Sequence, residues 1–309
     1  MSTDDTQVTD GVPYAPSVSM SAEEVLQSRE DRPVVRRGDE VRHPRHPWSE
    51  SVQALLAYLA EAGFDEAPRP RGVSGDHDDV SYIEGLSGDE ACTLVQTDAA
   101  VSEVAQLLRR YHDTVEAWQP ETEPVWFDGR RGTGDRPGEL VCHGDPGPWN
   151  LVWDLRQPVG RQLVGLIDWE YASVGTRLTD IGYALHYLAP LRDRSYWHGV
   201  LGMARKPRRR HRIAVFAEAY GVQLDEDLVD AVVAAQQAGV QMMIDLAALG
   251  RPRQVQLIAA GELERERRAV DWTERHRHKF SRAGATVLNQ VVAPSPYQPN
   301  TSNTTWAGW

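Results

Sequence analysis

Short apolar runs separated by turn residues occupy the first part of the chain, between about residues 29 and 86. The stretch PVVRRGDEVRH predicts two short strands around a Gly-Asp turn, and RPRGVSGDHDDVSYIEGL predicts a second strand pair. Between them, PWSESVQALLAYLAEAGF has the apolar spacing of a helix. We expect Ser49 to cap this helix, Gly63 to end it, and its buried stripe to consist of Val52, Leu55, Leu56 and Leu59. The region predicts a small sheet with one helix.

Helical spacing of apolar residues dominates the rest of the chain. Asp98 is placed to cap a helix whose apolar face comprises Val101, Val104, Leu107, Leu108 and Tyr111. Further helices are predicted over residues 179–191, 208–220, 227–249 and 253–280. Three strand-like runs, ELVC, NLVW and QLVGLI, interrupt these helices, and the turn DLRQPVGR joins the last two runs into a hairpin.

The two ends of the chain differ from its interior. Residues 1–28 are polar and acidic, and we expect a flexible segment there; residues 281–309 are rich in Pro, Ser, Thr and Asn and predict a disordered tail. The predicted organisation is a small N-terminal lobe over 29–86 and a larger, mainly helical lobe over 87–280. This is an α+β fold with two lobes.

Composition narrows the class of protein. The 309 residues are 41% hydrophobic and 25% charged, as in a soluble globular protein, and the net charge of −12 argues against nucleic-acid binding and favours a cationic ligand. The basic run ARKPRRRHR is interpreted as the solvated start of a helix. We found no secretory signal and no apolar run near the roughly 18 residues that span a bilayer, so we expect a cytoplasmic protein without a membrane partner. Cys92 and Cys142 are interpreted as packing residues.

The stretch LVCHGDPGPWNLVW carries the polar residues most indicative of chemistry. Asp145 and Asn150 lie five residues apart on the loop that enters the hairpin, and Asp168 follows the hairpin's last strand. Because a hairpin brings its two ends together, we expect these side chains to converge. Carboxylate and amide oxygens suit Mg²⁺, which is commonly shared with substrate phosphates. A further carboxylate that orients a hydroxyl would complete the parts that phosphoryl transfer requires.

The same residues carry a family resemblance. HGDPGPWN resembles the H-x-D-x-x-x-x-N catalytic loop of the aminoglycoside phosphotransferase and choline kinase group of the protein-kinase-like superfamily, and LIDWEYASVGTRLTDIGY resembles that group's metal-binding segment. The resemblance extends from about residue 30 to 280 and implies a two-lobed protein-kinase-like fold with an antiparallel sheet in the small lobe.

The resemblance also implies roles for individual residues. Asp145 would be the catalytic base or hydroxyl-orienting residue, and His143 would brace the catalytic loop beside it. Asn150 and Asp168 would bind Mg²⁺, while Asp180 would tie the metal-binding segment to the loop. Glu170 is either a further metal-site residue or an ordinary surface residue.

The resemblance is incomplete for the residues that would bind the nucleotide. VLQSREDRPVV, which precedes the first predicted strands, contains no glycine, so no glycine-rich phosphate loop is recognisable. Arg42 is the candidate for the cation that contacts phosphate, although an exposed strand arginine fits equally well, and Glu50 or Gln53 could be its helix partner. SYIEGL resembles the hinge between lobes, which makes Tyr82 and Ile83 the candidates for contact with the base of ATP or GTP.

Two hypotheses of different class follow. The first is a Mg²⁺-dependent phosphotransferase that moves the γ-phosphate of a nucleoside triphosphate, ATP before GTP, to a hydroxyl of a small molecule such as a cationic aminoglycoside or amino alcohol. The alternative is a kinase-like regulatory or binding protein whose catalysis is impaired because the glycine-rich loop is missing. A metal hydrolase that uses His143 and Asp145 lacks the additional His and Asp clusters of such sites.

Overall fold

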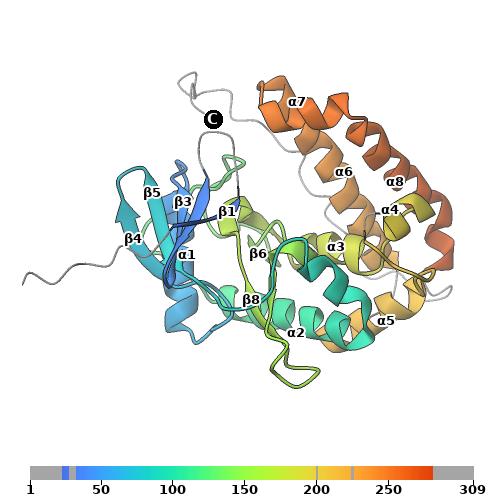
Figure 1. Cartoon of the computed structure of the whole chain (residues 1–309), viewed down its shortest axis with the longest axis horizontal. Helices are drawn as coiled ribbons and strands as arrows, with labels where there is room; N and C mark the ends of the chain where they lie inside the picture. The colour runs from blue at the N-terminus through green and yellow to red at the C-terminus, as the bar shows by residue number, and fades with distance from the viewer. Residues whose placement is uncertain (1–22, 28–32, 200, 224–225, 281–309) are drawn as a thin grey trace, which may run out of the picture.

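The computed structural model describes residues 23–27, 33–199, 201–223 and 226–280, and these form a small sheet lobe beside a larger helical lobe (Figure 1). The predicted flexible segment 1–28, apart from residues 23–27, and the predicted tail 281–309 lie outside the described residues. No single helix in the described ranges is long and apolar enough to span a bilayer.

The small lobe is a five-stranded antiparallel sheet with strand order β1-β2-β3-β5-β4. Its strands, in chain order, are β1 (Glu24–Gln27), β2 (Val34–Arg37), β3 (Glu40–Pro44), β4 (Pro70–Ser74) and β5 (His77–Ser81). Strands β2 to β5 confirm the two predicted strand pairs. Strand β1 was not predicted, and its four residues fall within the range 1–28.

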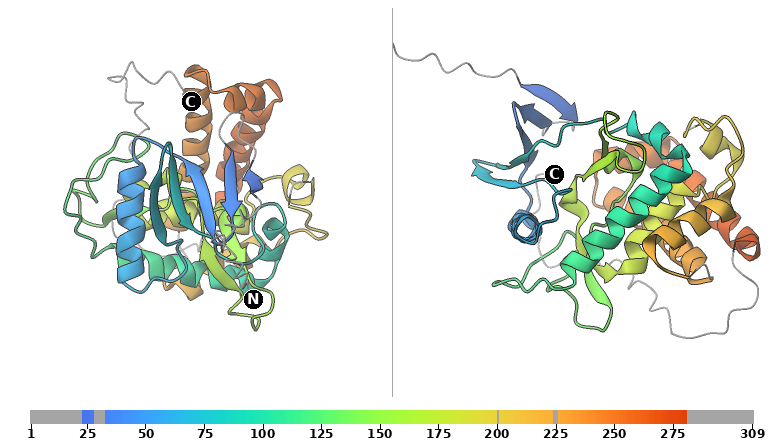
Figure 2. Two further views of the ribbon diagram at one scale, coloured as in Figure 1. Left: turned by 60° about the vertical axis from the view of Figure 1, so that its left-hand side comes forward. Right: turned by 90° about the horizontal axis from the view of Figure 1, so that it is seen from below.

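Helix α1 (Ser49–Glu61) connects the two strand pairs and packs beside the sheet (Figure 2). Leu55, Leu56 and Leu59 are buried as predicted, and Gly63, with φ +79°, follows the helix end. Ser49 is not the cap: Trp48 holds that position, and the Ser49 hydroxyl accepts a hydrogen bond from the His46 N–H at 2.9 Å. The serine therefore fixes the turn that leads into the helix.

The register of the sheet assigns each side chain of β3 to a face. Val41 lies opposite Val80, and both belong to the hydrophobic core that includes the leucines of α1. Successive residues of a strand point to opposite faces. Arg42, opposite Asp79, therefore lies on the face of the sheet away from α1.

The larger lobe contains the remaining helices and two short hairpin-like sheets. Its helices are α2 (Asp98–Val115), α3 (Arg177–Leu188), α4 (Arg194–Gly199), α5 (Arg209–Tyr220), α6 (Glu226–Ala248), α7 (Pro252–Ala259) and α8 (Glu262–His276), with short 3₁₀ helices η1 (Ala91–Gln96), η2 (Pro148–Asn150), η3 (Trp169–Tyr171) and η4 (Arg277–Lys279). Strands β6 (Glu139–Cys142) and β9 (Ser173–Thr176) pair antiparallel, and β7 (Leu151–Trp153) and β8 (Leu163–Leu166) form the predicted hairpin.

Two predicted helix boundaries are wrong. Thr97, not Asp98, caps α2, because the Thr97 side chain accepts the Ala100 N–H at 3.1 Å. The single helix predicted over 253–280 is divided into α7 and α8 at Gly261, whose φ of +82° is incompatible with a continuous right-handed helix. The apolar spacing continues through this break, which is why periodicity alone did not detect it.

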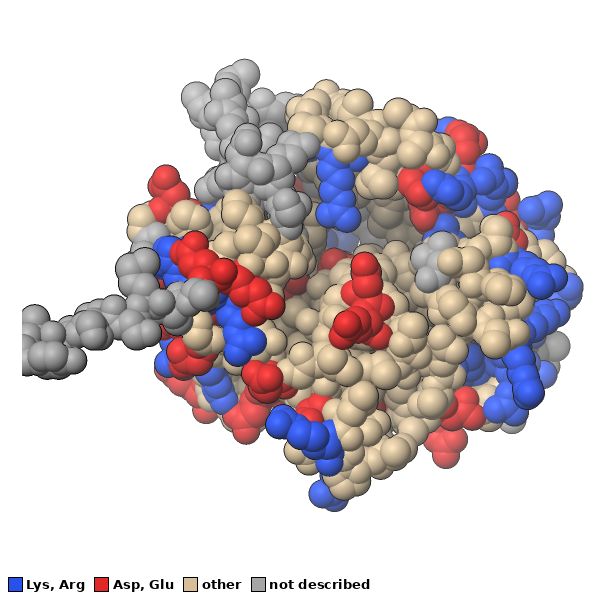
Figure 3. Space-filling view, in the orientation of Figure 1, with Lys and Arg blue, Asp and Glu red and all other residues tan. Residues whose placement is uncertain are grey.

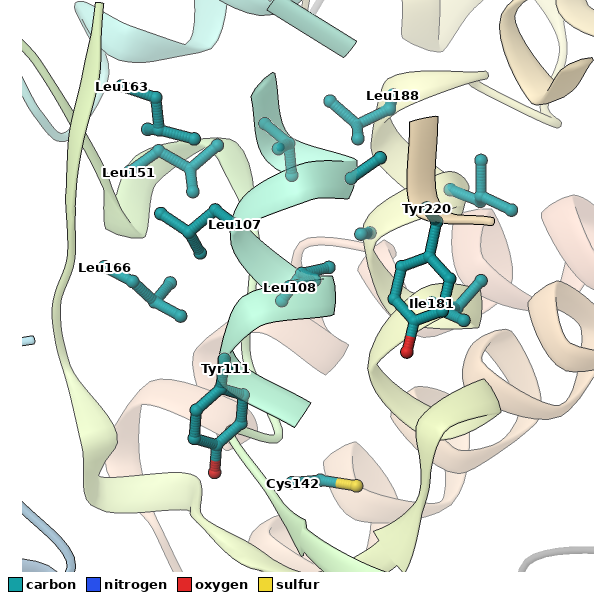
Figure 4. Close-up of a cluster of buried hydrophobic side chains, with 14 of the residues drawn as sticks. Leu107, Leu108, Tyr111, Cys142, Leu151, Leu163, Leu166, Ile181, Leu188 and Tyr220 are labelled. Carbon is teal, nitrogen blue, oxygen red and sulfur yellow. The ribbon is translucent and has the colours of Figure 1, made fainter. Parts of the chain in front are cut away.

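The core of the larger lobe forms around α2. The predicted apolar face of this helix is fully buried, and Leu107, Leu108 and Tyr111 pack against Leu151 and Leu166 of the hairpin and against residues of α3 and α5 (Figure 4). The Tyr111 hydroxyl donates to the Val141 carbonyl at 2.7 Å. The catalytic-loop candidates therefore lie between strands β6 and β7, which a rigid, apolar helix supports.

The basic run at the start of α5 is only partly solvated, which corrects the prediction. Arg209 and Arg212 are buried, with 7% and 4% of their surfaces exposed. Arg209 Nε donates to the Pro190 carbonyl at 2.7 Å, and Arg212 Nη1 donates to the Gln96 carbonyl at 2.7 Å. These guanidinium groups satisfy the carbonyl of the last residue of η1 and a carbonyl just beyond the end of α3, so the run is part of the helical core.

Candidate active site

The loop of residues 143–150 and the turn at Asp168 are joined through their backbones. The Ile167 N–H donates to the Asn150 carbonyl at 2.9 Å, immediately before Asp168. The hairpin β7–β8 produces this contact because its two strands pair in antiparallel register from Leu151 and Leu166 onward. The structure thus brings the loop of Asp145 and Asn150 next to the turn of Asp168.

His143 braces this junction from inside the protein. Its ring is fully buried, Nδ1 accepts the Asp145 N–H at 3.2 Å, and Nε2 bonds to the Ile167 carbonyl at 3.0 Å. Because Nδ1 accepts a hydrogen bond, the proton of the neutral ring belongs on Nε2. Burial lowers the pKa of His143 to about 4. With both nitrogens engaged, His143 positions the loop and does not face a substrate.

Asp180 ties the loop to helix α3. Its carboxylate is fully buried and accepts the N–H groups of His143 at 2.8 Å and Gly144 at 2.9 Å, together with His112 Nε2 at 3.1 Å. Burial by itself raises the pKa of Asp180, but the hydrogen bonds from His112 and from the Gly144 N–H and the electrostatic interaction with His112 bring it below its usual value. Asp180 therefore remains a carboxylate that fixes the backbone before Asp145.

Gly144 is required at this point by close packing. Its φ is +84°, and a Cβ atom there would lie 2.1 Å from the Tyr171 carbonyl oxygen. No side chain fits in that space, so the loop can approach the segment after Asp168 only with glycine at this position.

Asp145 lies at the centre of the loop with its carboxyl group partly held by neighbours. Oδ2 accepts Asn150 Nδ2 at 3.0 Å and Trp149 Nε1 at 3.3 Å. Oδ1 is buried and accepts no hydrogen bond of ordinary geometry within the described ranges, while the Tyr183 hydroxyl lies near the carboxyl group. Oδ2 is thus fixed by Asn150 and Trp149, and the Tyr183 hydroxyl is the neighbouring donor for the carboxyl group.

The pKa of Asp145 is raised to about 6. Burial is the main cause, and the negative charge of Glu170 adds to it, whereas hydrogen bonds from Tyr183, Trp149 and Asn150 act in the opposite direction. A carboxyl group in this range can take up a proton near neutral pH, which is the property of a general base.

Asp168 adopts an unusual backbone conformation. With φ 66° and ψ 66°, it is the one non-glycine residue among the described residues that has a positive φ. For such a residue the left-handed region costs roughly 1 to 2 kcal/mol, so neighbouring contacts must hold it. Trp169 Nε1, which donates to the Leu166 carbonyl at 2.9 Å, and the two bonds to Ile167 supply part of that support.

Asn150 and Asp168 fit a magnesium site that is completed by a nucleotide. The described residues contain no group of three or more His, Cys, Asp or Glu side chains able to hold a metal. An amide oxygen and a carboxylate on adjacent backbone segments nevertheless match Mg²⁺, which usually takes one or two protein ligands together with phosphate oxygens and water.

Glu170 interacts with the small lobe. Its Oε2 lies 3.0 Å from His46 Nε2, and its backbone carbonyl accepts Trp48 Nε1 at 2.8 Å. The Glu170 side chain is only 11% exposed. Sequence alone left a metal role and a surface role open; the structure adds a third role, contact between the lobes.

The hinge lies against the catalytic hairpin. Leu86 exchanges both backbone hydrogen bonds with Trp153, and a Cβ at Gly165 would lie 3.0 Å from Ile83 Cδ1. The Arg36 guanidinium lies over the Tyr82 ring at 3.6 Å. Within the described ranges, no hydrogen bond engages the backbone N–H or C=O of Ile83, which leaves this edge open for a planar ligand.

Arg42, the predicted phosphate-contacting cation, is paired with a carboxylate of the neighbouring strand. Its guanidinium pairs with Asp79 at 2.9 and 3.4 Å on the face of the sheet away from α1. Glu50 pairs with the exposed Arg45 at 2.8 Å and not with Arg42. The contact of Arg42 with phosphate therefore stays a prediction, and a single strand does not show in sequence which of its faces meets the helix.

Comparison with known proteins agrees with this geometry. Residues 116–212 match the Phosphotransferase enzyme family. The trifolitoxin immunity protein of Rhizobium leguminosarum bv. trifolii is 31% identical over an alignment of 192 residues, which covers 61% of this chain and 70% of that protein. The chain belongs to the phosphotransferase enzyme family. The family resemblance predicted from the two motifs is confirmed.

Solved structures show the fold of this phosphotransferase-family chain. The amicoumacin kinase hAmiN, in complex with AMP-PNP, Ca²⁺ and Ami, has a TM-score of 0.54 and covers 84% of this chain and 89% of its own at 12% identity. The GDP and kanamycin complex of APH(2")-IIia has a TM-score of 0.53, with 82% and 95% covered at 14% identity. A choline/ethanolamine kinase family protein from Mesorhizobium loti has a TM-score of 0.51, with 84% and 91% covered at 15% identity. The predicted two-lobed α+β fold is confirmed.

Sequence reasoning missed three residues of this phosphotransferase-family site. The first is Trp149, whose Nε1 donates to Asp145 and which the sequence does not distinguish from a core aromatic residue. Tyr183 lies three residues after Asp180 on α3, and this helical spacing places it on the same side as Asp180. Nothing in the sequence points to His46, whose partner Glu170 is 124 residues away.

Proposed function

We propose that this chain transfers the γ-phosphoryl group of a nucleoside triphosphate to a hydroxyl of a small molecule, with Asp145 as the general base. The observation that supports this most directly is the Asp145 carboxyl group, which has one oxygen fixed by Asn150 and Trp149, the other without a partner of ordinary geometry within the described ranges, and a pKa raised to about 6. Family membership supports the same reaction class.

In this reaction the acceptor oxygen forms a bond to the γ-phosphorus while the bond from that phosphorus to the bridging oxygen breaks. The acceptor proton passes to Asp145, and the nucleoside diphosphate leaves. Asn150 and Asp168 would hold Mg²⁺, which supplies neutralisation of phosphate charge when bound. His143 and Asp180 keep the loop in position throughout, since neither has a group left to face the substrate.

The nucleotide would lie between the lobes with its base at the hinge. Figure 3 shows the surface hollowed between the sheet and helices α6 and α7, with acidic and basic side chains at the rim. Tyr82 and Ile83 would border the base, and the backbone N–H and C=O of Ile83 would form hydrogen bonds with the edge of the base. We propose ATP as the donor, with GTP as the alternative to be tested in parallel.

The acceptor we propose is a cationic small molecule such as an aminoglycoside or an amino alcohol. The net charge of −12 favours a cation electrostatically, and the neighbouring folds include a kanamycin complex and a choline/ethanolamine kinase family protein. The relative named as a trifolitoxin immunity protein supports a second candidate, in which the acceptor hydroxyl belongs to a toxin.

Two measurements on the wild-type protein test the proposal. A nucleotide at about one hundred times its dissociation constant should add roughly 2.7 kcal/mol of stability, which a thermal shift with and without Mg²⁺ detects. Transfer of labelled γ-phosphate from ATP and GTP to aminoglycosides, amino alcohols and a toxin peptide then identifies the acceptor class. Absence of a thermal shift with every nucleotide would support the kinase-like binding protein instead.

A further inference from the structure

We propose that His46, Trp48 and Glu170 form a latch between the lobes that holds the Asp168 turn in its catalytic conformation. The α1 latch, as we call these three residues, joins the start of helix α1 to the 3₁₀ helix η3 directly after Asp168. Its members would be positioning residues, because they would act on the site through the backbone and side chain of Glu170.

The latch consists of two hydrogen bonds and a ring stack. His46 Nε2 lies 3.0 Å from Glu170 Oε2, and Trp48 Nε1 donates to the Glu170 carbonyl at 2.8 Å. The rings of His46 and Trp48 stack at 4.8 Å with planes 10° apart, which orients both donors toward the same residue. Both the side chain and the backbone of Glu170 are therefore fixed from the small lobe.

The latch lies well shielded from solvent. The His46 and Glu170 side chains are 14% and 11% exposed. By contrast, Arg45 and Glu50, beside them at the start of α1, pair at the surface with 35% and 83% exposure. A shielded hydrogen bond contributes more than an exposed ion pair, so the latch is the stronger link.

The latch matters for the site because it helps to restrain the left-handed backbone conformation of Asp168. Because a non-glycine residue with φ 66° depends on its surroundings to keep this conformation, we expect the turn to relax when those contacts are lost. His143 and Asn150 hold the residue before Asp168, through Ile167, whereas the latch holds Glu170, two residues after it. Both sides of the turn are thus restrained, one from the large lobe and one from the small lobe.

The restraint continues to the catalytic loop. Tyr171, the residue after Glu170, contacts Gly144 so closely that a Cβ there would lie 2.1 Å from the Tyr171 carbonyl. Phe127 packs edge-on against Tyr171 at 5.3 Å and against Trp48 at 6.4 Å. A shift of α1 would therefore move η3 against the backbone next to Asp145. Because such coupling is reciprocal, nucleotide binding to the small lobe and the order of the Asp168 turn should depend on each other.

Amide hydrogen exchange tests the latch without reference to the reaction. His46→Phe keeps the ring stack on Trp48 but removes the partner of Glu170, and Trp48→Phe keeps a ring but removes the donor to the Glu170 carbonyl. In each variant we expect exchange at residues 167–171 to accelerate about tenfold or more, while exchange in α2 is unchanged. Glu50→Gln, in the first turn of the same helix, is the matched control and should leave these rates unaltered.

Nucleotide binding tests the consequence for the site, and this part rests on the proposed function. The ratio of nucleotide affinity with Mg²⁺ to affinity without it should fall about three- to tenfold in His46→Phe, because only the metal-bound complex uses Asp168. A merely structural role would lower thermal stability and leave the ratio unchanged.

The outcomes separate the two proposals. Unchanged exchange at 167–171 in a folded His46→Phe or Trp48→Phe protein, or an acceleration spread evenly over the chain, would overturn the latch. Wild-type protein that binds no nucleotide would overturn the proposed function, while the exchange data would still decide the latch.

Discussion

His143 and Arg42 are both basic residues, and each lies in or next to a short strand, but their surroundings differ. His143 is fully buried, neutral and bonded to two backbone groups of the catalytic loop region. Arg42 pairs with the carboxylate of Asp79 on a sheet face away from α1, and its side chain is 19% exposed.

The same contrast holds for the two regions as a whole. Around Asp145 the polar groups bond to backbone atoms of distant segments, as Asp180 does with His143 and Gly144. In the small lobe, charged side chains pair with each other near the surface, as in Arg45–Glu50 and Arg37–Glu23. Bonds to buried backbone fix geometry, whereas exposed ion pairs contribute little. The first region should therefore be sensitive to substitution and the second tolerant.

The largest effect is expected at Asp145. Asp145→Asn keeps the shape of the loop residue but removes the proton acceptor, so turnover should fall about a hundredfold to ten-thousandfold while nucleotide affinity changes little. Phosphate transfer and nucleotide calorimetry on the same preparations measure both quantities. Equal turnover in variant and wild type would show that Asp145 has no catalytic role.

A substitution at Asp180 tests how much a buried polar group of the same region contributes to the stability of the protein. Asp180→Ala leaves the buried N–H groups of His143 and Gly144 without an acceptor, and we expect a loss of about 3 to 5 kcal/mol in the free energy of unfolding. Asp65→Ala is the control, since Asp65 is 82% exposed and pairs with Arg69 at the surface. Urea denaturation compares the two, and similar losses would remove the contrast between buried and exposed polar groups.

The next effect is expected on acidification, which should lower the free energy of unfolding through the buried residues His143 and His186. Burial lowers the pKa of His143 to about 4 and that of His186 well below its usual value, so neither takes up a proton in the folded state near pH 6. The unfolded chain does take up protons below about pH 6.5. The stability that each histidine contributes should therefore fall as pH drops from 6.5 toward 4, by about 1.4 kcal/mol per pH unit, while Asp145, whose pKa is raised to about 6, opposes this loss below pH 6.

Urea denaturation at pH 7, 6 and 5 measures this slope. His143→Gln should give a shallower slope than wild type because it removes one of the two groups. A slope that is the same in both proteins would mean that His143 is already protonated in the folded state.

The smallest effect on the site is expected at Arg42. Arg42→Met removes the partner of Asp79 and should cost about 1 to 2 kcal/mol of stability, but nucleotide affinity should change less than about threefold because the side chain lies on the face away from α1. Calorimetry with Mg²⁺-nucleotide is the measurement. A tenfold loss of affinity would return Arg42 to the phosphate site and contradict the register argument.

The sequence by itself determined the local elements and the order of the motifs. Strands β2 to β8, the apolar faces of α1 and α2, and the left-handed stop at Gly63 follow from apolar spacing and from glycine's conformational freedom, which act over a few residues. The approach of Asn150 and Asp168 was also predictable, because a hairpin necessarily brings its ends together.

Only the tertiary structure decided which faces and partners these elements meet. Arg42 lies on the face away from α1 because β3 pairs with β5 in the register that places Val41 in the core, and its partner Asp79 is 37 residues away. Arg209 and Arg212 are buried because carbonyls at the end of η1 and just beyond the end of α3 happen to face them, and Glu170 meets His46 across 124 residues. Such contacts depend on how whole elements pack together, which periodicity along the chain does not encode.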